Sequence, residues 1–362
     1  MGIKNLLVFL RQKCPTAFET THLENYKFQK IAIDTPIFMY KFKVVNPYDY
    51  LSLFARFINT LRYNDIHPIF VFDGDDVPNE KLRTRQRRQQ QRNSIRNKIK
   101  SIETDLLHYE NTGEITPLLS ELYNNILKKS KKIQISLLTN TFNALIIRDE
   151  INRLKRQVPD ITPGDVENVK KLLEITGIPY ITASGEAERM CATLKLNSKV
   201  DGIITEDSDV LAYGSSFISK IDTNEGACIT IHYDRIIKDL QLNPDTFLDL
   251  CIMMGNDYND NLPGIGSAKS YKLLCTHSTI DNVLANGNIN EEHKDILNHK
   301  RTREIFNTLD NDQSTNIRYC KRPDPGHVIS TLRDGKIKID YTLFLKNLTE
   351  PKHLTFIDGN AD

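Results

Sequence analysis

Two short stretches of sequence decide the fold: Ser184-Gly-Glu-Ala-Glu188 and Gly202-Ile-Ile-Thr-Glu-Asp-Ser-Asp209. The second begins with a short apolar run that is typical of a buried strand, and the first opens a segment with a helical pattern. Each stretch supplies a pair of carboxylates, Glu186 with Glu188 and Asp207 with Asp209. Strands and helices that alternate in this way predict an α/β sheet with helices on both faces.

Two earlier predicted strands also end in acids. Residues 31–34 and 68–73 read as short buried strands that end at Asp34 and Asp73, and an apolar helical stretch lies between them at 48–63. This β-α-β order predicts a parallel pair of strands with a right-handed crossover. Ligands on such sheets bind beyond the carboxyl ends of the strands, which is where these acids fall.

Carboxylates gathered at one sheet edge repel one another unless cations hold them together. Hard oxygen ligands suit Mg²⁺ or Mn²⁺, and two such ions about 4 Å apart stabilise the attacking and leaving oxygens of a phosphodiester displacement. The predicted metal ligands are Asp34, Asp73, Glu186, Glu188, Asp207, Asp209 and Asp257. A two-metal nuclease is therefore the function that these acids indicate.

A simpler interpretation exists for the two glutamates. Residues i and i+2 do not share a face in the middle of a helix, and two acids in a first turn can merely complement the helix dipole. Ser184-Gly185 provides a loop-to-helix start, however, at which Glu186 and Glu188 can point toward one site. The five other acids favour the metal-ligand interpretation.

The segment Lys81–Lys100 has nine basic residues and no acid. Like charges at i,i+4 destabilise a helix, so an isolated solvated helix is a poor explanation for this run. A polyanion partner removes the conflict, because Lys and Arg bind phosphates with little regard to sequence. The segment therefore predicts a basic helix that binds nucleic acid.

The bulk composition excludes other classes of protein. The 362 residues carry a net charge of +1, and the six cysteines stand singly without a C-x-x-C pair. This usage favours a reduced, intracellular protein over a disulfide framework or a zinc site. No stretch approaches the about 20 apolar residues of a membrane span, so no membrane partner is expected.

These motifs together resemble the flap endonuclease and 5′-nuclease superfamily, which also holds excision-repair endonucleases and 5′→3′ exonucleases. They follow the family's order over residues 1–275. The matching pieces are Met1-Gly-Ile, Ala32-Ile-Asp34 with Tyr40, Val71-Phe-Asp73-Gly, Gly177-Ile-Pro-Tyr, Glu186-Ala-Glu188, Thr205-Glu-Asp207-Ser-Asp209, Gly255-Asn-Asp257-Tyr and Gly264-Ile-Gly266.

The resemblance implies a fold and a set of roles. The fold would be a central, mostly parallel sheet flanked by helices (PIN-like), with an inserted helical arch and a helix–two-turn–helix element. The seven acids would hold two Mg²⁺ ions, with Mn²⁺ as a substitute, and hydrolysis would leave a 5′-phosphate. Lys81 with Arg87 or Arg88 would polarise the scissile phosphate, and K⁺ would bind at the Gly264-Ile265-Gly266 turn.

The same resemblance implies DNA contacts elsewhere. Tyr40 would stack on a base near the cut, and the basic helix would form the arch for the 5′ single strand. The residues expected to contact DNA are Gly2, Tyr40, Arg83, Arg85, Arg92, Arg96, Gly264, Ile265, Gly266, Lys269 and Lys272. The interval from Asp73 to Glu186 is longer than in typical cellular members, which predicts an enlarged arch.

The expected organisation has five overlapping parts. They are an N-terminal nuclease region at 1–95, a basic helical arch at 80–163, an internal nuclease region at 164–260, a helix–two-turn–helix element at 250–280, and a C-terminal region of unassigned role at 281–362. The sequence Leu343-Phe-Leu does not satisfy the sliding-clamp motif, so no motif supports a sliding-clamp partner. The protein is expected to be a monomer.

The residues leave the substrate open. The same site serves a structure-specific DNA endonuclease at 5′ flaps or junctions, a 5′→3′ exonuclease, or a remover of primer RNA. A catalytically silent DNA-binding scaffold predicts missing carboxylates, and all seven are present. Abundant Asn, Ile and Lys without Trp favour an AT-rich source such as a large DNA virus or a parasite, with action in the nucleus or a viral replication compartment.

Overall fold

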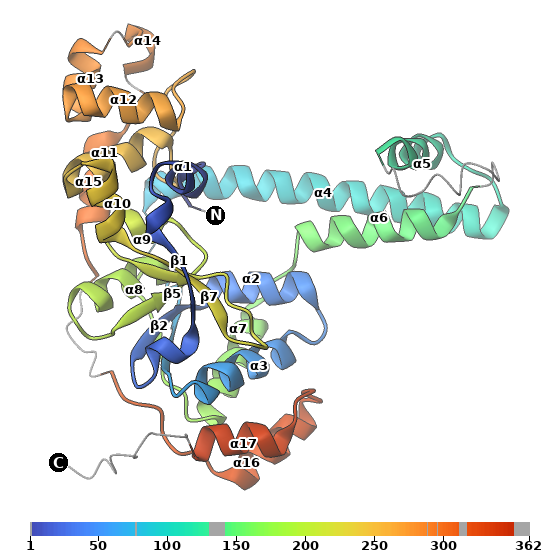
Figure 1. Ribbon diagram of the computed structural model, residues 1–362. Helices are drawn as coiled ribbons and strands as arrows, with labels where there is room; N and C mark the ends of the chain where they lie inside the picture. The colour runs from blue at the N-terminus through green and yellow to red at the C-terminus, as the bar shows by residue number, and fades with distance from the viewer. Residues whose placement is uncertain are drawn as a thin grey trace. The chain divides into compact units, whose positions relative to one another are not determined.

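A seven-stranded sheet forms the centre of the first of two structural units (Figure 1). The computed structural model describes residues 2–76, 78–129, 142–287, 289–294, 296–310 and 317–350. In sheet order the strands are β1 (Phe18–His22), β7 (Ala227–Ile231), β6 (Phe217–Ser219), β5 (Gly202–Ile204), β2 (Lys30–Asp34), β3 (His67–Phe72) and β4 (Tyr180–Thr182). The five strands from β6 to β4 are parallel, while β7 runs antiparallel to both β6 and β1.

The predicted mostly parallel α/β sheet is confirmed, and the antiparallel pair β1 and β7 adds to it. β2, β3 and β5 lie side by side with Asp34 opposite Val71 and Ile33 opposite Ile204. The carboxyl ends of these three strands therefore meet at one edge of the sheet, as parallel pairing requires.

Helices cover both faces of this sheet. The first unit contains α1 (Leu6–Lys13), η1 (Pro15–Ala17), η2 (Leu23–Tyr26), α3 (Tyr50–Tyr63), α7 (Pro163–Ile175), α8 (Ala187–Leu196), α9 (Asp209–Ala212), α10 (Tyr233–Leu240), α16 (Pro325–Asp334) and α17 (Tyr341–Thr349). Phe54 and Phe57 of α3 pack on Phe70, while Ala187 and Cys191 of α8 belong to a core that includes Val71. Successive strand residues face opposite sides, so α3 and α8 lie on opposite faces.

A group of short helices follows the sheet in the sequence. It consists of α11 (Pro244–Met254), α12 (Ser267–His277), α13 (Ile280–Asn286), α14 (Glu291–Lys294) and α15 (His299–Asn307). Arg303 of α15 donates to both carboxylate oxygens of Asp249 at 2.6 and 2.7 Å and to Asp281 at 2.8 Å. Because two-bond pairing of Arg with a carboxylate fixes geometry, this network holds α15 against α11 and α13.

The second unit comprises residues 40–48 and 83–161, and it has a small core of its own. It contains the end of α2 (Thr35–Val45), most of α4 (Asn79–Thr112), and α5 (Pro117–Lys129) and α6 (Ala144–Gln157). Apolar residues of α4 beyond Ile95 pack on α5 and α6, and Figure 1 shows α6 running beside α4. Between Asn79 and Gln157 the described residues thus form three helices.

The described part of the chain has six free cysteines and no helix both long and apolar enough to cross a membrane.

Candidate metal centre

All seven predicted ligands belong to the first unit. Six of them lie near the end of a strand or the start of a helix, and Asp257 follows α11. Asp34, Glu186, Asp209 and Asp257 are buried, Glu188 and Asp207 are half-buried, and Asp73 is exposed. Ionised carboxylates are seldom buried without compensating charge. Burial of four of these acids therefore requires compensating positive charge nearby.

The loop before α8 presents the two glutamates as the sequence predicts. Glu186 occupies the N-cap of α8 in an extended conformation, and Glu188 lies in its first turn. The loop is tied to the end of β3, because Gly74 donates its amide to Gly185 O at 2.7 Å and the Ala187 amide donates to Asp73 Oδ1 at 2.9 Å. Strand β3 thus fixes the position of this helix start.

A chain of hydrogen bonds orders the acids after β5. The Thr205 hydroxyl donates to Asp34 Oδ2 at 2.6 Å and accepts from the Asp207 amide at 3.0 Å. The Asp209 amide in turn donates to Asp207 Oδ1 at 3.0 Å. The Thr205 hydroxyl thereby connects the Asp34 carboxylate at the end of β2 to the main chain of the loop after β5.

Gly2 was predicted to contact DNA, and the structure packs it against the acid loop. A Cβ at Gly2 would overlap the carboxylate of Asp207 and lie 2.5 Å from Ser208 Oγ, and the backbone has a φ of 90°. The next amide, of Ile3, donates to Ser208 Oγ at 3.0 Å. The start of the chain therefore supports the loop of Asp207 and Asp209, and only glycine fits there without strain.

Lys81, at the start of α4, lies among the acids. Its ammonium contacts Glu186 directly and lies 3.4 Å from Asp257 Oδ2 and 3.7 Å from Glu188 Oε1. The side chain is 11% exposed. Burial alone would lower the pKa of Lys81, but Glu188 and Asp257 outweigh it and raise that pKa.

The acids themselves show the strain of close like charges. Burial, followed by repulsion from Glu188, raises the pKa of Asp34 well above its usual range and raises the pKa of Asp207 to about 6. Burial and then Asp207 raise the pKa of Asp209 well above the usual range. A single lysine therefore does not neutralise the cluster.

These residues fit divalent cations. The donors are carboxylate oxygens, and Asp209 Oδ1 is buried without a hydrogen-bond partner among the described residues. The contact of the Lys81 ammonium with Glu186 shows that the acids accept a positive charge among them. Among the described residues no three acid, His or Cys side chains already form a ligand set around one point. The acids are thus grouped near a lysine rather than arranged as a finished coordination sphere.

Tyr258 was noted in the sequence only as part of a motif, and the structure gives it a contact at this site. Its hydroxyl donates to Glu186, and the Lys81 ammonium lies 5.8 Å from its ring centroid. Burial raises the pKa of Tyr258 far above its usual range, so this hydroxyl stays protonated and remains a donor. A tyrosine directly after the predicted ligand Asp257 was the available signal for this contact.

The Gly264-Ile265-Gly266 turn leads into α12. Gly264 has a φ of 71°, Ile265 is buried, and Gly266 is the N-cap of α12. Lys269 and Lys272 of this helix are exposed. Open backbone N–H groups at a helix start, with lysines one and two turns on, suit a phosphate.

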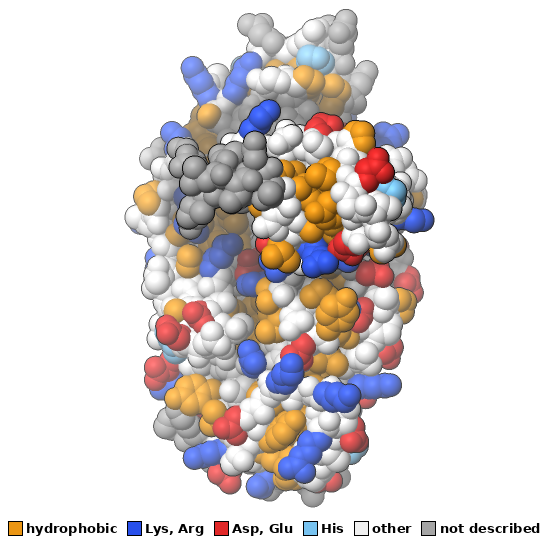
Figure 2. All heavy atoms as spheres, turned by 90° about the vertical axis from the view of Figure 1, so that its right-hand side faces the viewer, with side chains coloured by type: hydrophobic (Ala, Val, Ile, Leu, Met, Phe, Trp, Pro, Cys, Tyr) orange, Lys and Arg blue, Asp and Glu red, His pale blue; other side chains and the backbone are white. Residues whose placement is uncertain are grey.

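The other predicted DNA-binding residues belong to the second unit. Arg83, Arg85 and Arg87 are exposed on α4, and Arg88, Arg92 and Arg96 are half-buried. Arg96 lies 3.3 Å from Asp160, and the Tyr40 hydroxyl donates to Gln157 O at 3.2 Å. The far end of this unit exposes Leu107, Leu118 and Leu145, and Figure 2 shows hydrophobic side chains on that end.

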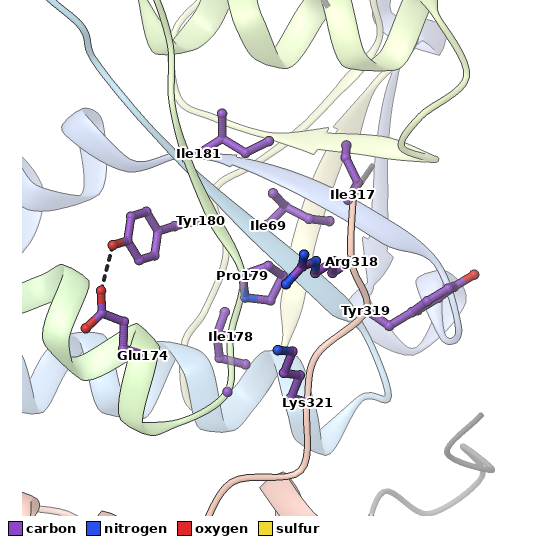
Figure 3. A pocket seen from close by; sticks show the side chains of 11 residues that line it. Ile69, Glu174, Ile178, Pro179, Tyr180, Ile181, Ile317, Arg318, Tyr319 and Lys321 are labelled. Carbon is purple, nitrogen blue, oxygen red and sulfur yellow. Dashed lines mark hydrogen bonds between the residues drawn. The ribbon is translucent and has the colours of Figure 1, made fainter. Parts of the chain in front are cut away.

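A cavity of about 510 Å³ lies elsewhere on the first unit, between residues 177–181 and 317–321 (Figure 3). Arg318 and Lys321 point into it beside Ile69, while Glu174 accepts a hydrogen bond from the Tyr180 hydroxyl at 2.7 Å. None of the predicted site residues lines this cavity. This cavity is therefore separate from the carboxylates.

Known proteins share both the sequence and the fold. Residues 1–95 match the XPG N-terminal domain, and residues 177–257 match the XPG I-region. A probable RAD2-like endonuclease of Invertebrate iridescent virus 6 is 37% identical over 89% of this chain and 84% of its own length. Flap endonuclease 1 of Aedes aegypti is 27% identical over 79% and 69% of the two chains.

Solved structures with lower identity share the fold. The catalytic core of Rad2 in complex with a DNA substrate has a TM-score of 0.63 at 21% identity, covering 96% of this chain and 98% of that one. Flap endonuclease-1 from Methanococcus jannaschii has a TM-score of 0.57 at 22% identity, covering 91% and 94%.

The matched regions contain the strand-end acids, and the viral relative covers most of both chains. The chain therefore belongs to the flap endonuclease and 5′-nuclease superfamily that includes the XPG and Rad2 proteins, and its function is that of a structure-specific 5′ nuclease in DNA processing.

Proposed function

We propose that the chain hydrolyses DNA phosphodiester bonds near junctions of single and double strands, with two Mg²⁺ ions held by the seven carboxylates. Mn²⁺ is the expected substitute. The main support is the burial of four of these acids, two of which, Glu186 and Asp257, contact the Lys81 ammonium. Buried carboxylates of this density need cations, and oxygen donors select Mg²⁺ or Mn²⁺.

The ligands would be Asp34, Asp73, Glu186, Glu188, Asp207, Asp209 and Asp257. When bound, the two ions supply positive charge to the attacking and leaving oxygens. Lys81 then places its ammonium on the scissile phosphate, with Arg87 and Arg88 as the further cations. Each cation placed where charge develops contributes about 10²–10³-fold to the rate.

DNA is gripped at two further places in this proposal. The Gly264-Ile265-Gly266 turn and K⁺ hold the duplex backbone, helped by Lys269 and Lys272 of α12. The exposed arginines of α4 contact the single strand, and Tyr40 stacks on a base near the cut. Support comes from the open helix start at Gly266 and from the exposure of the lysine side chains of α12 and of the arginine side chains of α4.

The setting follows from the relatives. Two RAD2-like endonucleases of invertebrate iridescent viruses are 37% and 36% identical to this chain. We infer a monomeric nuclease of viral replication, repair or recombination, acting in the nucleus or a viral replication compartment.

The deciding experiment is cleavage of end-labelled 5′ flap, double flap, nicked duplex, four-way junction and RNA-tipped flap substrates with Mg²⁺, beside Asp209→Ala. We expect incision at junctions by the unsubstituted protein, and a loss of about 10³-fold or more in the variant with DNA binding kept. Asp209 is chosen because one oxygen of its buried carboxylate finds no hydrogen-bond partner in the part of the chain that the structure describes.

The product pattern separates the remaining alternatives. A ladder of single nucleotides from the 5′ end would indicate an exonuclease, and preference for the RNA-tipped flap a primer remover. Binding without incision in Mg²⁺ and Mn²⁺ alike would leave a DNA-binding scaffold and overturn the proposal.

A further inference from the structure

Asp310 lies just after α15, in the C-terminal region to which the sequence assigned no role. Its carboxylate is 2% exposed and contacts one residue of the loop before α8 and one residue of the first turn of α8, on either side of the two predicted glutamate ligands. Asp310 Oδ1 lies 2.5 Å from Arg189 Nη2 and accepts a hydrogen bond from the Ser184 hydroxyl at 3.2 Å. One oxygen thus meets both ends of the segment 184–189.

The segment between these contacts holds both Glu186 and Glu188. Arg189 folds back over Gly185, where a Cβ would lie 2.7 Å from Arg189 Nη2 and 2.6 Å from Asp76 O. The absence of a side chain at Gly185 therefore lets the guanidinium pass over the loop and reach Asp310.

The backbone of Asp310 adds a third connection to the same helix. Its amide donates to the Thr193 hydroxyl at 3.1 Å, and this hydroxyl donates to Arg189 O at 2.9 Å. Thr193 is fully buried. Side chain and main chain of Asp310 therefore both act on the first turns of α8.

Helix α15 reaches the site by a second path. The Phe306 ring packs on Tyr258 with centroids 5.4 Å apart, and the Tyr258 hydroxyl donates to Glu186. The Arg303 network fixes α15 itself. The position of Asp310 is therefore set by a helix that also supports Glu186.

We propose that Asp310 is a positioning residue. Through Arg189 and Ser184 it holds residues 184–189, which are the end of the loop and the first turn of α8, in the geometry that binds the metal ions. The proposal rests on the proposed function of this site. Close acids repel each other, so a loop with two of them spreads unless something outside the cluster restrains it. Groups behind metal ligands orient them, and their loss typically weakens metal binding about 10–100-fold.

The contact between Arg189 and Asp310 uses only part of the hydrogen-bonding capacity of the two side chains. Among the described residues, Arg189 Nε and Asp310 Oδ2 have no hydrogen-bond partner, so the contact is one-pronged rather than bidentate. Burial of such a pair is weak evidence for a stability role.

The test measures Mn²⁺ affinity by electron paramagnetic resonance and the Mg²⁺ dependence of single-turnover cleavage. Variants are Asp310→Asn, Arg189→Met, both together, and Ser184→Ala. We expect about tenfold weaker Mn²⁺ binding in the two single variants, no further loss in the double variant, and recovery of the rate at high Mg²⁺. Arg235→Met is the matched control, because it breaks an exposed pair with Glu19.

Metal affinity unchanged in Asp310→Asn and Arg189→Met would overturn the inference, even if both melt at lower temperature. Should these variants not fold, an unchanged affinity in Ser184→Ala decides against it and a weaker one supports it. Lack of Mn²⁺ binding by the unsubstituted protein would instead overturn the proposed function, and this inference with it.

Discussion

The carboxylate cluster and the basic first half of α4 both concentrate charge of one sign, but in opposite surroundings. The acids come from strand ends far apart in the chain and are largely buried. The basic side chains all belong to one stretch of a single helix, and several of them are exposed. A buried cluster needs small cations inside the protein, whereas an exposed row suits a polyanion outside it.

The surroundings of the side chains also change along α4. Lys81 lies in the first turn of the helix and is buried among acids, while Arg83 and Arg85, two and four residues later, are exposed. Beyond Ile95 the helix gains apolar positions that pack on α5 and α6. One helix thus joins the acidic site, a solvated basic face and a small core.

The strongest challenge to this comparison replaces Arg87 and Arg88 together by Ala. We expect cleavage at saturating DNA to fall by about 10²-fold with a smaller loss of affinity, because these cations would act on the scissile phosphate. Single-turnover cleavage and equilibrium binding of a 5′ flap measure the two effects. Lys98→Ala with Lys100→Ala removes the same charge farther along the helix, and an equal loss of rate there would show that charge alone matters.

Addition of Mg²⁺ tests whether the buried carboxylates bind a cation. Mg²⁺ at ten times its dissociation constant should stabilise the folded protein by about 1.4 kcal/mol, which thermal unfolding measures as a rise in Tm. Asp209→Ala should abolish most of this rise, because it removes a buried carboxylate of the cluster. A rise of the same size in the variant would mean that Mg²⁺ binds elsewhere.

The smallest effect concerns the exposed bases alone. Arg83→Ala with Arg85→Ala should reduce the slope of log affinity against log salt by about 1.4, since each lost contact with a phosphate of the single strand lowers the slope by about 0.7. The cleavage rate at saturating DNA should stay the same. An unaltered slope would show that these two arginines do not contact phosphate.

Local patterns predicted much of the site. Asp34 and Asp73 follow short apolar runs, and parallel strands bring their carboxyl ends to one edge, so their meeting follows from the strand assignments. The helix start at Glu186 follows from Ser184-Gly185 in the same way. By contrast, β1 has the polar sequence Phe-Glu-Thr-Thr-His, and its pairing with β7 was not predicted.

The sequence by itself determined the superfamily, the parallel sheet and the identity of the acids, because these depend on short-range pattern and motif order. Only the tertiary structure placed Lys81 beside Glu186, Gly2 against Asp207, and Asp310 on Arg189. The first contact spans 105 residues. Such contacts depend on how whole elements pack, and a lysine, a glycine or an aspartate looks locally the same whether it is solvated or buried at a site.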